Sequence, residues 1–122
     1  MGKPLMRTLQ AASVTPAEFH IVLALAADDR HGYALMRQVA ADSAGAVRLG
    51  PGTLYGAIKR LLDYGFIREV ASRVDPELDD SRRKYYRLTP AGRAAAVAEA
   101  RRLDELVALA RTRRILPLGG TP

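Results

Sequence analysis

The clearest candidates for chemistry in the sequence are two adjacent cations, Lys59 and Arg60, in the stretch PGTLYGAIKRLLDYG. Apolar residues recur at helical spacing through this stretch, at Leu54, Ile58, Leu61 and Leu62. The period predicts a helix from Pro51 to Tyr64 with one buried face. Gly56, Lys59 and Arg60 then face outward, and such cations can bind phosphates or guanine edges. An ordinary solvated helix face would carry the same charges, so both interpretations stay open.

The start of this helix also offers groups to an anion. Pro51 fixes the first turn, and the N–H groups of Gly52 and Thr53 have no partners within the helix. That end of a helix carries a positive partial charge and can hold a phosphate. Thr53 and Tyr55 are expected on the flanks of the outward face. The Thr53 hydroxyl either contacts a phosphate or bonds within its own turn.

Gly56 is expected to be exposed inside the helix, where glycine costs about 0.5 to 1 kcal/mol relative to alanine. A close approach of the helix backbone to a groove wall would offset this cost. The simpler alternative is that Gly56 is a tolerated surface residue.

A second segment, HGYALMRQVA, opens a helix predicted over residues 32–43 with Leu35, Met36 and Val39 on its buried side. In a helix-turn-helix the start of this helix runs beside the DNA backbone. Tyr33 can then offer its hydroxyl to a phosphate while its ring packs on the following helix. A half-buried core tyrosine is the alternative. Gly32 is expected to allow a sharp turn, and His31 to be a capping or surface histidine.

Other elements form the scaffold for these residues. Thr15 and Glu18 make a capping box around Pro16 and start the first helix. Its buried face is predicted to hold four apolar residues, Phe19, Val22, Leu23 and Ala26. After Gly65 the period changes to 2, and FIREVASR and KYYRL indicate a hairpin. Three helices followed by a hairpin are the plan of a winged helix-turn-helix.

The hairpin is rich in cations, namely Arg73, Arg82, Arg83, Lys84 and Arg87. A wing usually meets DNA beside the minor groove, where arginine is favoured. Its tip, however, holds four carboxylates that would repel phosphate, those of Asp75, Glu77, Asp79 and Asp80. The basic residues close to the strands, and not the tip, are therefore expected to contact DNA.

After the hairpin, Thr89 and Pro90 begin a long final helix. Small and apolar residues form a narrow stripe along it, at Ala96, Ala100, Leu103, Leu106 and Ala110. Such a stripe is typical of a helix that pairs with another helix.

Composition limits the classes of function. The 122-residue chain has a net charge of +6 and a pI near 10.2, which favours polyanionic partners. The first 47 residues carry four basic and four acidic side chains, so the excess begins at Arg48. The chain has no cysteine, and His20 and His31 are too few and too far apart for a closed metal site. The inventory therefore predicts no enzyme, no cofactor and no metal. No apolar run has the length of a membrane span, and a cytoplasmic location is expected.

Four stretches together resemble the PadR family of bacterial transcription regulators: TPAEFHIVLALA, HGYALMRQV, GPGTLYGAIKRLLDYGFI and RKYYRLTPAG. They stand in the family's order and cover residues 15 to 95. The resemblance implies a winged-helix repressor that binds double-stranded operator DNA as a homodimer, with a small-molecule inducer as a further partner. The family's DNA-facing positions correspond to Tyr33, Thr53, Tyr55, Lys59 and the basic wing. The single C-terminal helix resembles the short-tailed subfamily.

The expected fold class is therefore mainly α with a small β-hairpin, a winged helix-turn-helix plus a long C-terminal dimerisation helix. Residues 1–13 are expected to form an N-terminal arm or short helix, and residues 14–89 the DNA-binding domain. Residues 90–115 would form the dimerisation helix, and residues 116–122 a disordered tail. The main alternative function is a winged-helix module that binds a protein, or binds DNA without sequence preference.

Overall fold

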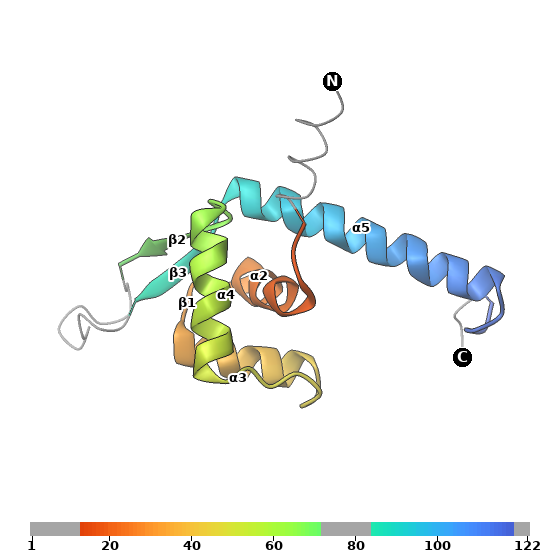
Figure 1. The fold of residues 1–122 in the computed structure, drawn as a ribbon, viewed down its shortest axis with the longest axis horizontal. Helices are drawn as coiled ribbons and strands as arrows, with labels where there is room; N and C mark the ends of the chain where they lie inside the picture. The colour runs from red at the N-terminus through yellow and green to blue at the C-terminus, as the bar shows by residue number, and fades with distance from the viewer. Residues whose placement is uncertain (1–12, 72–83, 119–122) are drawn as a thin grey trace, which may run out of the picture.

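The computed structural model describes residues 13–71 and 84–118. The elements run in the order α2 (Pro16–Ala27), β1 (Arg30–His31), α3 (Gly32–Asp42), α4 (Pro51–Asp63), β2 (Ile67–Val70), β3 (Tyr85–Leu88) and α5 (Pro90–Thr112). Figure 1 shows α2, α3 and α4 grouped beside the small sheet, with α5 running along one side and beyond it. The expected fold class, mainly α with a small hairpin and a long final helix, is confirmed.

The sheet has one strand more than the sequence predicts. β2 and β3 form the expected antiparallel hairpin, with Ile67 opposite Leu88 and Val70 opposite Tyr85. β1 pairs with the other edge of β3, with Arg30 opposite Tyr86, so the strand order is β1-β3-β2. A strand of two residues is too short to show a period. It fixes the start of α3 directly beside the wing.

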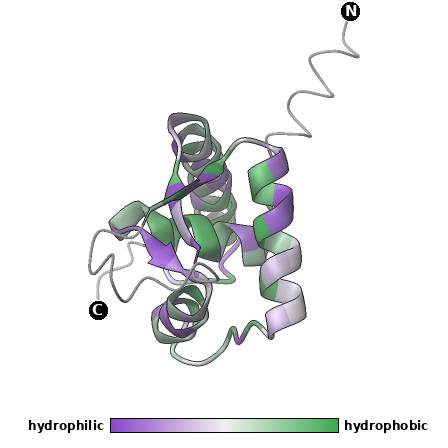
Figure 2. Ribbon diagram, turned by 90° about the vertical axis from the view of Figure 1, so that its left-hand side faces the viewer, coloured by the Kyte–Doolittle hydropathy of each residue, from purple (hydrophilic) through white to green (hydrophobic). Residues whose placement is uncertain are grey.

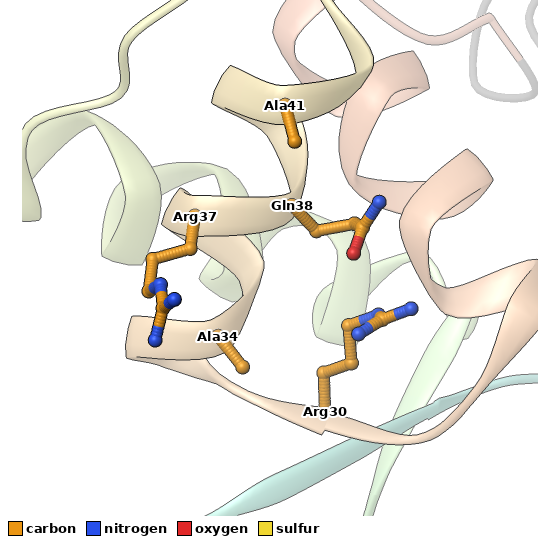
Figure 3. A pocket seen from close by; sticks show the side chains of 5 residues that line it. All are labelled: Arg30, Ala34, Arg37, Gln38 and Ala41. Carbon is orange, nitrogen blue, oxygen red and sulfur yellow. The ribbon is translucent and has the colours of Figure 1, made fainter.

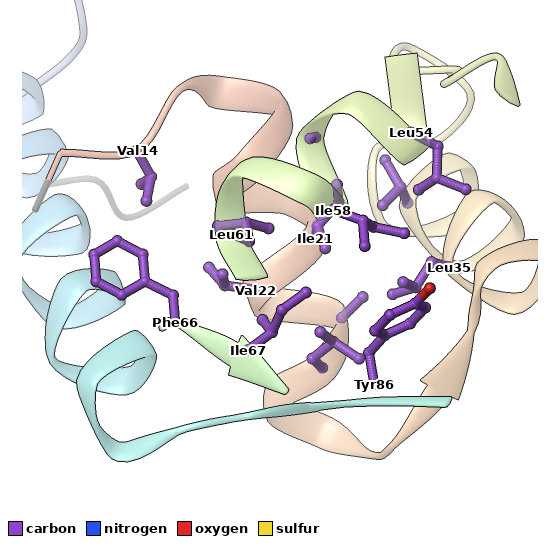
Figure 4. Packing of buried hydrophobic residues seen from close by; sticks show 14 of the residues in the cluster. Val14, Ile21, Val22, Leu35, Leu54, Ile58, Leu61, Phe66, Ile67 and Tyr86 are labelled. Atoms are coloured by element: carbon purple, nitrogen blue, oxygen red, sulfur yellow. The ribbon is translucent and has the colours of Figure 1, made fainter. Parts of the chain in front are cut away.

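The three helices α2, α3 and α4 close around one core, which extends to the sheet and to the start of α5. Its fully buried large apolar side chains are Ile21, Val22, Leu35, Val39, Leu54, Leu61 and Ile67. Figure 4 shows this packing, with Phe66 and Val14 on the side toward α5 and Tyr86 on the side toward α3. Burial of these side chains is the main force that holds the helices together.

The predicted buried face of α2 is wrong in part. Val22 is buried and Phe19 is half-buried, but Leu23 is 45% exposed and Ala26 is exposed. The buried face instead contains Glu18, Ile21, Val22, Ala24 and Leu25. The stretch IVLALAA is apolar on all sides, so its period does not select a face. The predicted faces of α3 and α4 are confirmed, because polar residues define their outer sides.

Only the first half of α5 packs on the body. Ala95 is buried in the core, and Gly92 lies against the chain before β2, where a Cβ would come within 2.8 Å of the Phe66 carbonyl carbon. Farther along, α5 extends away from the other helices (Figure 1). The helix ends at Thr112 and not at residue 115, and residues 113–118 follow as turns. Residues 1–12 of the expected arm and residues 119–122 of the expected tail lie outside the described residues.

Candidate nucleic-acid interface

The outward side of α4 has in part the composition that its sequence predicts: Lys59 is exposed, but Gly56 is half-buried and Arg60 turns toward α2. Leu54, Ala57, Ile58 and Leu61 are buried, and Figure 2 shows apolar residues on the side of α4 that faces the body. On the opposite side Gly52 and Lys59 are exposed and Gly56 is half-buried. Asp63 is exposed at the far end of that side. The α4 outward face, defined by Gly52, Gly56, Lys59 and Asp63, therefore presents two glycines and one lysine ahead of a single carboxylate.

The first turn of α4 has no side-chain cap. Gly50 is the N-cap residue and makes no side-chain hydrogen bond, and Pro51 follows it. The hydroxyl of Thr53 is exposed and has no hydrogen bond within the described part of the chain. The N–H groups of Gly52 and Thr53 are thus available to an anion at the positive end of the helix dipole.

Arg60 is held by a partner that the sequence pattern does not reveal. Its Nε donates to Oε2 of Glu18 at 2.7 Å, and the Glu18 side chain is only 2% exposed. The same carboxylate accepts the N–H of Thr15, which completes the predicted capping box of α2. Arg60 keeps half of its side-chain surface exposed, but its guanidinium is oriented toward α2.

The two predicted wing cations that the structure describes, Lys84 and Arg87, are also paired. Arg87 forms a bidentate ion pair with Asp29, with Nη2 2.7 Å from Oδ2, and this hydrogen bonding raises the pKa of Arg87. Lys84 lies 3.6 Å from Glu69 on the neighbouring strand, and both are about half exposed. The other three predicted DNA-binding residues of the wing, Arg73, Arg82 and Arg83, lie outside the described residues.

Tyr55 links α4 to the start of α3. Gly32 is buried, and a Cβ there would come within 2.9 Å of Cζ of Tyr55, so the tyrosine side chain occupies that space. The chain changes from strand β1 to helix α3 at Gly32, but the Gly32 backbone is not in the left-handed region, so this change of direction does not itself need glycine. A side chain at position 32 would therefore have to displace the ring of Tyr55, which is itself 51% exposed.

Tyr33 is not a half-buried core residue: 60% of it is exposed. The guanidinium of Arg37, one turn later, lies over the Tyr33 ring at 5.8 Å from its centroid, a cation–π contact. The ring contact recorded for Tyr33 is therefore to its own helix. His31 acts as the N-cap of α3, as expected: its Nδ1 accepts the N–H of Ala34 at 3.2 Å. The sequence pattern does not mark Arg37 as a functional residue. Its spacing of four from Tyr33 could have indicated it, because residues four apart lie on the same side of a helix.

The predicted stripe on α5 divides into two parts. Ala96 is half-buried against the core of its own chain. Leu103 and Leu106, 37% and 49% exposed, lie on the extended part of α5, with Ala100 exposed and Ala110 half-buried. Within the described chain this part of the stripe has no covering element.

Two further classes of site are absent from the described ranges, 13–71 and 84–118. Three or more histidines or carboxylates do not come together there to hold a metal ion. None of the helices there combines the length and the apolar composition needed to cross a membrane.

Comparison with known proteins agrees with this geometry. The family described as "Transcriptional regulator PadR-like family" matches residues 21–98. The chain is 38% identical over 101 residues to "Transcriptional regulator Rv3488" of Mycobacterium tuberculosis, covering 83% of this chain and 85% of that protein. It is 37% identical over 90 residues, 74% of this chain, to an uncharacterized 37.1 kDa protein in transposon Tn4556 of Streptomyces fradiae, of which it spans only 24%. The crystal structure of a PadR family transcription regulator from Clostridium difficile R20291 superposes with a TM-score of 0.67 at 26% identity, over 80% of this chain and 97% of that one.

Proposed function

Because the chain belongs to the PadR-like family of transcriptional regulators, DNA-binding proteins that are not enzymes, we propose that it is a sequence-specific repressor in the cytoplasm. In this proposal it binds operator DNA as a homodimer, with α4 in the major groove. The start of α3 and the wing lie on the flanking backbone. Release from DNA by a small-molecule effector is the part of the proposal that rests on family membership alone.

The observation that carries the proposal is the α4 outward face. Two glycines leave the helix backbone open to a groove wall, and no described carboxylate pairs with Lys59. The uncapped first turn adds N–H donors for a phosphate at the same end of the helix. An amphipathic helix that only packs against its own domain has no need for this combination. Tyr33, Thr53, Tyr55 and Lys59 are the contacts that we expect to matter most.

The extended half of α5 supports the homodimer. Leu103 and Leu106 expose large apolar side chains on one side of an isolated helix, where pairing with the same helix of a second copy would bury them. Two copies related by a twofold axis would present two α4 helices to half-sites about 34 to 36 Å apart, one turn of the duplex.

The decisive experiment measures binding to a duplex obtained by in vitro selection and to its scrambled version, at several salt concentrations. A specific regulator keeps a preference of about 10³ or more at physiological salt, because base contacts add to the phosphate contacts. Lys59→Ala should weaken operator binding without lowering stability, since the side chain is exposed. Equal affinity of the wild type for the two duplexes would favour the nonspecific module, and an unchanged Lys59→Ala dissociation constant would reject that residue's role.

A further inference from the structure

A shallow basic cleft lies on the solvent-exposed side of α3. Arg30, Ala34, Arg37, Gln38 and Ala41 line it, and it encloses about 320 Å³. Figure 3 shows the two arginines on opposite sides of the cleft, with Ala34 between them and Ala41 farther along α3. Alanine side chains at these positions leave room for a ligand to approach the helix itself.

The positive charge of this cleft is not neutralised within the described chain. Arg37 makes no ion pair there, and its one recorded contact is the cation–π interaction with Tyr33. Arg30 donates through Nε to the carbonyl of Ala24 at 3.0 Å, which orients its guanidinium without removing its charge. The cleft is therefore a fixed site of positive potential.

Two of the four acidic residues that balance these arginines in the sequence form ion pairs with other arginines. Glu18 holds Arg60, and Asp29 holds Arg87. Asp28 accepts the N–H of Asp29. Asp42, at the end of α3, accepts Nε2 of the cleft residue Gln38 at 2.7 Å, so it is the carboxylate next to the cleft although it does not line it. Because none of these carboxylates lines the cleft, the charge balance of the first 47 residues does not hold locally.

Its position connects the cleft to the proposed DNA-binding surface. Arg37 stacks over Tyr33, which is in the first turn of α3, and that turn touches α4 through Gly32 and Tyr55. β1, which carries Arg30, pairs with strand β3 of the wing. The cleft thus continues the surface formed by the start of α3, the flank of α4 and the wing.

We propose that the α3 cleft binds a phosphate of the DNA backbone outside the groove that α4 enters, with Arg37 as the principal contact and Arg30 as the second. Guanidinium groups are well suited to phosphate oxygens. A small-molecule pocket is typically enclosed and mostly apolar, whereas this cleft is open and three of its five lining residues are polar or charged. A contact of this kind adds affinity without reading the base sequence. The inference rests on the proposed function, because it assigns a second contact to the same duplex.

The test compares wild type with Arg37→Gln and with the matched control Arg101→Gln, which removes an equal, exposed and unpaired charge from α5. The dissociation constant is measured against salt for the selected duplex and its scrambled version. Arg37→Gln should lower the magnitude of the salt slope by about 0.9 per bound chain, equivalent to about tenfold weaker binding near 0.1 M salt. The loss should be equal on both duplexes, and Arg37→Lys should recover most of it. Arg101→Gln should behave as wild type.

A second variant tests the cleft while retaining both arginines. Ala34→Glu places a carboxylate between them and should weaken binding to both duplexes, and Ala98→Glu on α5 is its matched control. Urea denaturation of each variant confirms that it is folded. A salt slope of Arg37→Gln equal to that of wild type overturns the inference. The inference is also overturned if an NMR titration shows inorganic phosphate binding to the cleft of wild type while Arg37→Gln binds the duplex as tightly as wild type does. Loss of operator preference in the wild type would instead defeat the proposed function, and the slope on the scrambled duplex would still test the cleft.

Discussion

Arg60 of α4 and Glu18 of α2 are 42 positions apart in the sequence and meet at 2.7 Å, Nε to Oε2. Glu18 also accepts the N–H of Thr15 through Oε1, so one buried carboxylate caps α2 and anchors α4. The orientation of the proposed recognition helix is thereby coupled to the start of the first described helix. Arg60, which the sequence places among the DNA-facing cations, acts in the structure as a positioning residue for α4.

Glu18→Gln tests this coupling. The glutamine oxygen can still accept the N–H of Thr15, but the charge that attracts Arg60 is lost in a buried position. We expect the free energy of unfolding to fall by about 1 to 3 kcal/mol. Urea denaturation at neutral pH measures it, with Arg101→Gln as a control that should lie within about 0.5 kcal/mol of wild type. A Glu18→Gln protein as stable as wild type would show that the ion pair contributes nothing net.

Gly56→Ala separates stability from binding. A Cβ at Gly56 would meet only Nη1 of Arg60, at the ordinary contact distance of 3.7 Å. Alanine should therefore stabilise α4, by up to about 1 kcal/mol. If the backbone of α4 approaches a groove wall, the same methyl group should weaken operator binding. Thermal denaturation and a binding titration of the same protein decide between the two interpretations of Gly56. A variant with higher stability and unchanged affinity would identify a tolerated surface residue.

The parts of the fold that the sequence predicts are those set by local chemistry. The capping box at Thr15 and the start of α4 at Pro51 depend only on neighbouring residues. Gly65, just after α4, has the left-handed conformation that is common for glycine at the end of a helix. The face of α4 is equally clear because polar residues define its outer side. The face of α2 is not, because its apolar residues surround the helix.

The parts that the sequence does not predict depend on residues brought together only by the fold. Lys59 and Arg60 are adjacent and both basic, but Lys59 is exposed to solvent whereas Arg60 forms an ion pair with Glu18. Arg37 shows the converse. The first 47 residues have no net charge, but in the fold two of their four carboxylates pair with arginines from later in the chain. The reason for Gly32 is likewise tertiary, since the Tyr55 ring that excludes a side chain there comes from another helix.

Lowering the pH should reduce the free energy of unfolding through the Glu99–Arg102 ion pair on α5. Glu99 is 8% exposed, and its two hydrogen bonds with Arg102 hold the pKa of the carboxyl below the ordinary value of 4.5. A carboxyl with a depressed folded-state pKa adds stability above its unfolded-state pKa. That contribution is lost as pH falls through the folded-state value. The urea midpoint should therefore fall more steeply below about pH 4.5 in wild type than in Glu99→Gln. Parallel profiles of the two proteins would contradict the assignment.

Leu103→Asp tests the homodimer. Leu103 is 37% exposed on the extended part of α5, so the monomer loses little packing when it is replaced. In a paired helix the same substitution buries an unpaired charge in an apolar contact, which is costly enough to separate the copies. Sedimentation velocity should show a monomer for Leu103→Asp and a dimer for wild type. Ala98→Asp, which adds the same charge to an exposed position of α5 outside the stripe, should remain a dimer. If Leu103→Asp also remains a dimer, the interface lies elsewhere.

A monomeric Leu103→Asp should also bind an operator with two half-sites much more weakly than wild type does. Its affinity for a single half-site should change far less, because the dimer contributes the linkage of two α4 helices.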